Sequence, residues 1–199
     1  MSMNVIGITG GTGTGKTTAA KALQSMGAHI LDCDAIYHEI LQNNSKMRSE
    51  IEAMFNGVTI NGEINRKKLG EIVWNNPDSL EKLNEITHKY IDLEIDNRIN
   101  SLKTQDADII AIDAIALIES GQDKKCDFVI GVVAPKENRI KRIMHRDNLT
   151  EDQALKRIDA QQPESFYREK CEFIIENISK TEAEFGEKCR KFLRSILYE

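Results

Sequence analysis

At 199 residues, 40% of them apolar, the chain is long enough for one domain with a proper core, or for one domain with an inserted subdomain. Its 32 acidic and 27 basic side chains give a formal net charge of −5, which argues against a nucleic-acid partner held by electrostatic attraction. The N-terminal apolar stretch is too short for a signal peptide or a membrane span, and the four cysteines include no C-x-x-C pair; both features favour a cytoplasmic protein with reduced thiols and no membrane partner.

A short apolar strand at residues 5–8 precedes a glycine-rich segment at residues 10–17. This segment fits every fixed position of the pattern G-x-x-x-x-G-K-[ST]. Glycines let backbone N–H groups turn inward, and the N-terminus of a helix predicted from Thr17 to Leu23 adds attraction for anions. Lys16 is expected to reach the β- and γ-phosphates of ATP, and the Thr17 hydroxyl to hold Mg²⁺. The alternative is a glycine-rich turn that happens to precede a helix, which fits less well with strand, loop, lysine and threonine all in place.

We therefore predict that this segment binds the nucleotide through one continuous run of residues. The predicted ligands of ATP are Gly10, Gly11, Thr12, Gly13, Thr14, Gly15, Lys16, Thr17 and Thr18.

A second strand is predicted at residues 29–31, after Gly27, a plausible helix C-cap. It ends at Asp32, and Asp34 follows. In an open parallel sheet, ligands bind outside the carboxyl ends of the strands, so a carboxylate here is expected to face the same cleft as the phosphate loop. One acidic group can accept or orient the proton of an acceptor hydroxyl, and another can help to place Mg²⁺. Alternatively, one of the two aspartates caps the helix that begins near Ala35.

Helical patterns without a convincing strand fill the next 70 or so residues, too many for a loop. Apolar side chains recur at spacings of three and four and predict one amphipathic helix over residues 79–102, capped near Asp78 after Pro77; they are Leu80, Leu83, Ile86, Tyr90 and Leu93. We interpret this region, about residues 35–105, as a helical insertion that binds the acceptor. Within it, Trp74 and Tyr90 are expected in the core rather than as stacking platforms.

His88 has two interpretations: a contact with an anionic acceptor, or a partly buried hydrogen bond.

Three further strands are predicted at residues 108–113, 128–133 and 173–175, followed by a terminal helix at 181–197. Strands that alternate with helices build a parallel sheet covered on both faces. The sequence thus predicts an α/β protein with three layers and a parallel five-stranded sheet. Asp113 ends the third strand, where its carboxylate either binds Mg²⁺, directly or through water, or caps the following turn.

A basic face is predicted on the helix at residues 137–147. Arg139, Arg142 and Arg146 lie three and four residues apart, opposite an apolar stripe. Arginine binds phosphate oxygens with its planar fork, so this face is suited to closing over ATP as a mobile helical lid, at about residues 137–162. The alternative is a solvated charged face, but a phosphate loop in the same chain favours the lid.

Beyond the phosphate loop, several segments resemble the dephospho-coenzyme A kinase family. Residues 30–36 resemble its D-x-D motif, 87–91 its histidine-containing helix, and 113–119 the segment after its third strand. Residues 142–147 and 157–161 are similar to its arginine-bearing lid. The resemblance spans nearly the whole chain and implies a single P-loop kinase domain over residues 1–199.

The resemblance implies transfer of the γ-phosphate of ATP to the ribose 3′-hydroxyl of dephospho-coenzyme A, with Mg²⁺. It implies that Asp34 is the catalytic base and that arginines of the lid lie at the phosphates. Asn177 loosely matches a family segment near the adenine of the nucleotide. The expected catalytic residues are Lys16, Asp34, Arg142 and Arg146; the expected acceptor ligands are Asp32, Asp34, His88 and Asp113; Thr17 and Asp113 are expected at the metal.

Two other functions remain open from the sequence. One is another small-molecule P-loop kinase, such as a nucleotide kinase, because acceptor choice depends on the shape of the pocket. The other is a nucleotide-binding regulator, although no water-orienting motif is evident. The expected partner is a small-molecule substrate, and the chain is expected to be a monomer or a weak homo-oligomer.

Overall fold

The computed structural model describes residues 3–74, 76–105 and 107–198. The chain divides into two compact units. The first comprises Met1–Leu31 with Leu102–Glu199, and the second comprises Asp32–Ser101. Among the described residues, no helix combines the length and the apolar character needed to cross a bilayer.

The first unit contains a five-stranded sheet in the order β2-β5-β1-β6-β7. β1 pairs in parallel with β5 and with β6, and β6 pairs in parallel with β7. Side chains of β1, β5 and β6 are buried on both faces, which explains their nearly continuous apolar sequence. The predicted sheet and its strand positions are confirmed: β1 (Asn4–Thr9), β2 (His29–Asp32), β5 (Ile109–Asp113), β6 (Phe128–Val133) and β7 (Phe173–Glu176).

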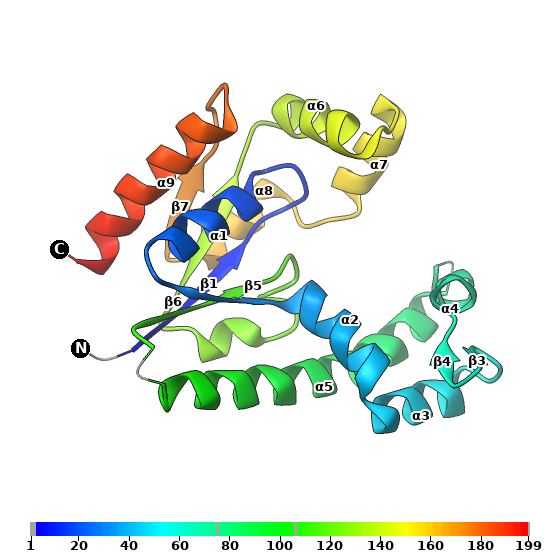
Figure 1. Ribbon diagram of the computed structural model, residues 1–199. Helices are drawn as coiled ribbons and strands as arrows, with labels where there is room; N and C mark the ends of the chain where they lie inside the picture. Colours follow the sequence, from blue (N-terminus) through cyan, green and yellow to red (C-terminus); the bar gives the residue numbers. More distant parts are fainter. Residues whose placement is uncertain (1–2, 75, 106, 199) are drawn as a thin grey trace. The chain divides into compact units, whose positions relative to one another are not determined.

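Helices cover both faces of this sheet. On one face, α1 (Lys16–Ser25) and α9 (Glu182–Leu197) lie side by side over β1, β6 and β7 (Figure 1). The other face is covered by α8 (Glu164–Lys170) and the 3₁₀ helix η1 (Gln122–Lys125). The core between α1, α9 and the sheet includes Ile6, Ile8, Leu23, Ile130, Val132, Ile175, Phe185 and Leu193.

The end of α1 shows how local sequence sets an element boundary. Gly27 adopts the left-handed conformation, with φ of +93°, and its N–H donates to the carbonyl of Gln24 at 3.0 Å. The N–H of Ala28 donates to Leu23 at 3.1 Å. This is the glycine C-cap that the sequence predicts.

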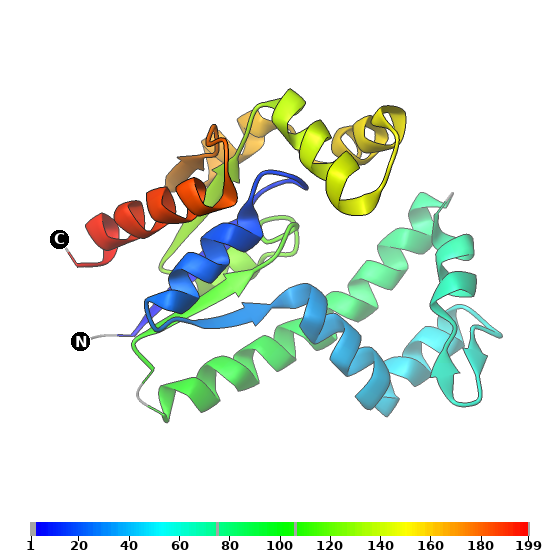
Figure 2. The same ribbon diagram turned by 45° about the horizontal axis from the view of Figure 1, so that its top comes forward.

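A helical hairpin follows β6 in the same unit. It consists of α6 (Lys136–Asp147) and α7 (Glu151–Asp159), the yellow-green and yellow helices of Figure 2. Asn148 turns the chain in the left-handed conformation, and a reciprocal capping box between Thr150 and Gln153 starts α7. The hairpin has a small core of its own, made of Ile143, Ala154 and Ile158 with Ile140, Met144 and Leu149 around it.

The second unit is mainly helical. It contains α2 (Cys33–Asn43), α3 (Ser45–Met54), α4 (Arg66–Val73) and most of α5 (Pro77–Lys103). The expectation of no strand here was wrong, because β3 (Thr59–Ile60) and β4 (Glu63–Ile64) form an antiparallel hairpin. Asn61 and Gly62 form its turn, both at positive φ. An Asn-Gly pair is a strong hairpin signal, and it was overlooked because its two flanking strands are so short.

Three details of the predicted long helix need correction. Its cap is Asn76, whose Oδ1 accepts from the N–H of Ser79 at 3.0 Å, and Pro77 is the first helical residue. Asp78 therefore lies in the first turn and is not the cap. Leu80 and Leu93 are exposed, since the buried positions are Leu83, Thr87, Tyr90, Ile95 and Ile99.

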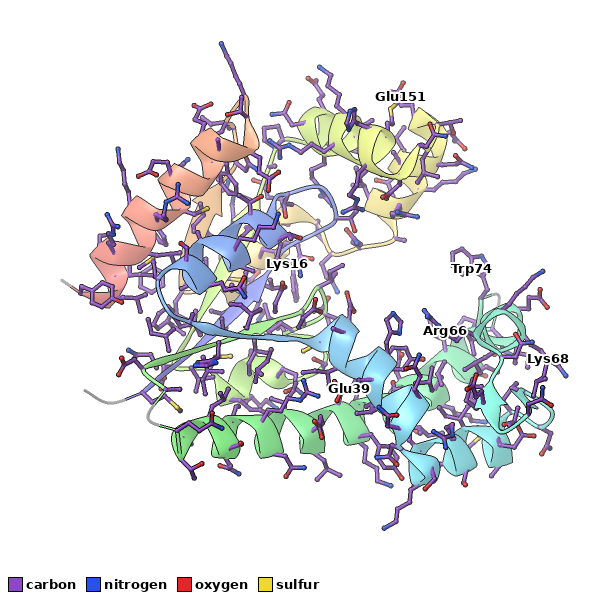
Figure 3. The ribbon with its side chains drawn as sticks, viewed as in Figure 1. Lys16, Glu39, Arg66, Lys68, Trp74 and Glu151 are labelled. Atoms are coloured by element: carbon purple, nitrogen blue, oxygen red, sulfur yellow. The ribbon has the colours of Figure 1, made fainter. Side chains whose placement is uncertain are left out.

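Tyr90 is buried, as expected, but the interpretation of Trp74 as a core residue was wrong. Its side chain is 85% exposed at the end of α4 and points away from the helix (Figure 3). The buried residues of α4 are Leu69 and Val73, and Trp74, which directly follows Val73, faces outward.

Candidate active site

The segment between β1 and α1 forms a glycine loop at the carboxyl end of the central strand. Gly10, Gly13 and Gly15 have φ of +143°, +81° and +105°, values that side-chain-bearing residues rarely adopt. A Cβ on Gly10 would lie 2.3 Å from the carbonyl oxygen of Val132. Within the loop, the Thr14 hydroxyl donates to the carbonyl of Gly11 at 2.8 Å. These glycines are therefore required by the path of the backbone.

The loop ends at the N-terminus of α1. Gly15 precedes the helix without a side-chain cap, and the first N–H groups of a helix have no intrahelical acceptor. Such a terminus attracts anions. The Thr17 side chain is exposed here, whereas the Thr18 hydroxyl lies 3.4 Å from a carboxylate oxygen of Glu182 in α9.

Lys16, labelled in Figure 3 at the start of α1, forms an ion pair with Asp113. Asp113 is the last residue of β5 and pairs in register with Ile8 of β1, so the two strands bring its carboxylate to the loop. Both side chains are largely buried, with 15% and 9% of their surfaces exposed. The structure thus brings together two of the predicted site residues.

Arg142 and Asn177 form hydrogen bonds with backbone carbonyls of the phosphate loop. One Nη of Arg142 donates to the carbonyl of Gly13 at 3.1 Å, and the other donates to Oδ1 of Asn177 at 3.1 Å. Asn177, buried just after β7, donates its Nδ2 to the carbonyl of Thr14 at 2.8 Å. Burial lowers the pKa of the Arg142 guanidinium, whose ordinary value is high enough to keep it charged at neutral pH.

Arg139 and Gln161 contact the same loop at Thr12. Arg139 Nε donates to the carbonyl of Thr12 at 2.9 Å, and the N–H of Thr12 donates to Gln161 Oε1 at 2.8 Å. The sequence singled out Arg139 only as part of a basic face, and it missed Gln161 as a site residue. Gln161 ends the segment 157–161 that resembles an arginine-bearing lid, but the sequence assigned it no role, since its partner lies 149 positions away.

Arg146 does not join these contacts. Its Nε and Nη2 donate to the two carboxylate oxygens of the neighbouring Asp147, at 2.7 and 2.8 Å. These bonds raise the pKa of Arg146. The three arginines of the predicted basic face therefore divide: Arg139 and Arg142 bind the loop, and Arg146 lies against its own helix.

The remaining predicted site residues lie in the second unit. Asp32 is the cap of α2, because its Oδ1 accepts from the N–H groups of Asp34 and Ala35 at 2.9 and 3.1 Å. This decides between the two aspartates for the cap and leaves the Asp34 side chain exposed in the first turn. His88, on α5, is half-buried, and burial lowers its pKa.

Over residues 3–74, 76–105 and 107–198, no group of three or more His, Cys, Asp or Glu side chains is arranged to hold a metal ion. Proteins that bind Mg²⁺ together with phosphates usually supply one or two ligands of their own, and the phosphates and water supply the rest.

Comparisons with known proteins agree on one family. A family model described as dephospho-CoA kinase matches residues 4–183. A dephospho-CoA kinase of Dehalococcoides mccartyi is 37% identical over 177 residues, covering 88% of this chain and 89% of the relative. The structure of the dephospho-CoA kinase from Campylobacter jejuni is similar, with 30% identity, a TM-score of 0.72 and 98% of each chain covered. A protein from Thermus thermophilus has 28% identity and a TM-score of 0.83 over 100% of both chains.

Proposed function

Because this chain belongs to the dephospho-CoA kinase family, we propose that it transfers the γ-phosphate of ATP to the ribose 3′-hydroxyl of dephospho-coenzyme A. It is a phosphotransferase with a hydroxyl acceptor, and it has the P-loop kinase fold. The product is coenzyme A, so the reaction is the last step of coenzyme A synthesis. The observation that carries the proposal is the glycine loop, with Lys16 at the uncapped N-terminus of α1.

The proposed ATP site consists of the loop residues 10–18 with Lys16, Arg142 and Asn177. An uncapped helix N-terminus and left-handed glycines provide backbone N–H groups for phosphate oxygens. Lys16 and Arg142 add positive charge where negative charge spreads over the transferred group. The contacts of Asn177 with Thr14 and Arg142 support its place at the nucleotide.

The proposed metal is Mg²⁺, held by the Thr17 hydroxyl and, directly or through water, by Asp113. When bound, Mg²⁺ neutralises charge on the β- and γ-phosphates. The exposed Thr17 side chain and the position of the Asp113 carboxylate beside Lys16 support this assignment.

For the acceptor, we propose Asp34 as the base that takes or orients the proton of the 3′-hydroxyl. Its role is supported by the cap contact, which occupies Asp32 and leaves the Asp34 carboxylate exposed. Asp32, His88 and Asp113 are proposed acceptor ligands. Since burial lowers its pKa, His88 is suited to a neutral hydrogen bond rather than to an ion pair at neutral pH.

Two segments have proposed roles in addition to the loop. Residues 35–105 are proposed to bind the acceptor, and residues 137–162 to act as a lid that brings Arg146 to the phosphates. A lid is supported by the separate core of the hairpin, which allows it to move as one piece.

We also propose that the protein works in the cytoplasm. The four cysteines include no C-x-x-C pair, and burial raises the pKa of both Cys171 and Cys189 to about 12. Such thiols are protonated and unreactive near neutral pH, as suits a reducing compartment.

Steady-state ADP release with a panel of acceptors tests the function. We expect kcat/KM for dephospho-coenzyme A to exceed that for any nucleoside monophosphate by at least about a hundredfold. Lys16→Ala should reduce kcat by at least about a hundredfold, because it removes charge stabilisation from the transferred phosphoryl group. Circular dichroism checks that the variant is folded, since Lys16 is largely buried and ion-paired with Asp113. A preference for a nucleoside monophosphate would instead identify a nucleotide kinase, and ADP release that ignores acceptors would indicate a regulator.

A further inference from the structure

All three polar groups of Thr12, in the middle of the phosphate loop, are bonded to two side chains. Its carbonyl accepts from Arg139 Nε at 2.9 Å, and its N–H donates to Gln161 Oε1 at 2.8 Å. Its hydroxyl accepts from Gln161 Nε2 at 2.7 Å. Gln161 Oε1 also accepts from Arg139 Nη2 at 3.1 Å, which closes the network.

The geometry fixes the orientation of the glutamine amide. A backbone N–H can only donate and a guanidinium can only donate, so the atom between them must be the amide oxygen. The amide nitrogen then faces the Thr12 hydroxyl. Glutamine therefore suits this position because it offers an acceptor and a donor on the same planar group.

Arg139 is built into the protein rather than reaching into solvent. It is 6% exposed, and a buried guanidinium is costly to leave without partners, so its bonds to Thr12 and Gln161 hold it in one place. Burial also lowers its pKa. A Cβ on Gly11 would lie 2.4 Å from Arg139 Nη2 and 2.9 Å from Gln161 Oε1, so the loop backbone fits closely against both side chains.

The two side chains come from opposite ends of the α6–α7 hairpin. Arg139 lies in the first turn of α6, and Gln161 lies two residues beyond the end of α7. The backbone of the loop is thus bonded to both ends of the segment proposed as the lid, and those ends are bonded to each other.

We infer that Gln161, together with Arg139, is a positioning residue that holds the phosphate loop in its ATP-binding shape by fixing Thr12. The inference rests on the proposed function only in that the loop binds ATP. The guanidinium of Arg139 is hydrogen bonded to Thr12 and Gln161. Arg139 therefore shapes the phosphate site and does not itself bind phosphate.

The test measures binding of a non-hydrolysable ATP analogue with Mg²⁺ by titration calorimetry. Gln161→Met keeps the length of the side chain and removes its amide, so we expect the Kd of the analogue to rise about tenfold. KM for the acceptor should stay within about twofold, because the loop and not the acceptor pocket is disturbed. Gln24→Met is the matched control, since Gln24 is exposed near the C-terminus of α1 and lies outside both the phosphate loop and the α6–α7 hairpin.

Thr12→Val provides a second variant, which removes only the hydroxyl. If Gln161 acts through Thr12, the double variant Gln161→Met with Thr12→Val should raise Kd by less than the product of the two single effects. The reason is that Gln161→Met alone already removes the hydrogen bond to the Thr12 hydroxyl. Independent effects would overturn the inference, as would a normal Kd for Gln161→Met or an equal loss of affinity in Gln24→Met. Analogue binding does not involve the acceptor, so these outcomes are separate from a failure of the wild-type protein to phosphorylate dephospho-coenzyme A.

Discussion

At the scale of single residues, two glycines with positive φ can be compared: Gly10 in the phosphate loop and Gly27 after α1. Gly10 has no room for a methyl group, because a Cβ would meet the backbone carbonyl of Val132 at 2.3 Å, whereas nothing lies within 4 Å of a Cβ on Gly27. We expect Gly10→Ala to lower the free energy of unfolding by at least about 3 kcal/mol, through strain and steric overlap. Gly27→Ala should cost only about 1 kcal/mol of backbone strain. Urea denaturation of both variants measures the difference, and equal losses would mean that the loop relaxes freely.

The paired aspartates allow a second comparison. Asn caps a helix about as well as Asp, so Asp32→Asn should leave the start of α2 intact. Asp34→Asn keeps the size of the side chain but removes its basicity, and should lower kcat by about a hundredfold or more while the Kd of an ATP analogue changes less than about threefold. The reverse pattern, with Asp32→Asn far more damaging to kcat, would exchange the two proposed roles.

The residues that the sequence identified share a local signal. The phosphate loop could be predicted because its spacing is contiguous and each residue type has a direct chemical reason. The cap of α2 could not be assigned from sequence, since Asp32 and Asp34 both suit it and only the contacts of Asp32 decide. Gln161 was missed and Trp74 was misplaced because their surroundings depend on how distant segments pack.

At the scale of elements, the α6–α7 hairpin is proposed to move as a unit. Its own core and capping box make it a separate cooperative piece, and it meets the phosphate loop through Arg139, Arg142 and Gln161. We expect amide hydrogen exchange across residues 137–162 to slow when an ATP analogue with Mg²⁺ binds, while exchange in α9 changes little. Exchange followed by mass spectrometry checks this.

Arg146 provides the kinetic side of the same prediction. Since it hydrogen bonds only to Asp147 of its own helix among the described contacts, Arg146→Ala should affect stability little. If the lid brings it to the phosphates, the variant should lose about tenfold or more in kcat. Unchanged exchange together with normal kinetics for Arg142→Ala and Arg146→Ala would restore the interpretation of a solvated face.

The five strands of the sheet and the helices α1, α6 and α9 were predicted close to their observed positions, because apolar runs and helical spacing are local signals. Helix α8 and the 3₁₀ helix η1 were not predicted. The hairpin β3–β4 was missed because each strand has only two residues, too few for an alternating pattern. The N-terminus of α5 was displaced by two positions. Asn76 and Asp78 are both good caps, and Pro77 at the first helical position favours the residue before it.

At the scale of the whole molecule, the chain contains a unit with the phosphate loop and a helical unit that carries Asp34 and His88. The family fixes the type of reaction, and the contacts of the first unit support the proposed phosphate site. In the proposed function the second unit binds the acceptor, whose identity then depends on the shape of that unit.

The most direct test of the central claim is the position of the transferred phosphate. The protein would be incubated with Mg²⁺, ATP and dephospho-coenzyme A, and the product analysed by phosphorus NMR and mass spectrometry. We expect one new phosphate monoester on the ribose 3′-oxygen, formed in equal amount to ADP, and no transfer to an acceptor that lacks the 3′-hydroxyl. Phosphate at any other position, or the same amount of ADP formed with an acceptor that lacks the 3′-hydroxyl, would contradict the proposed function.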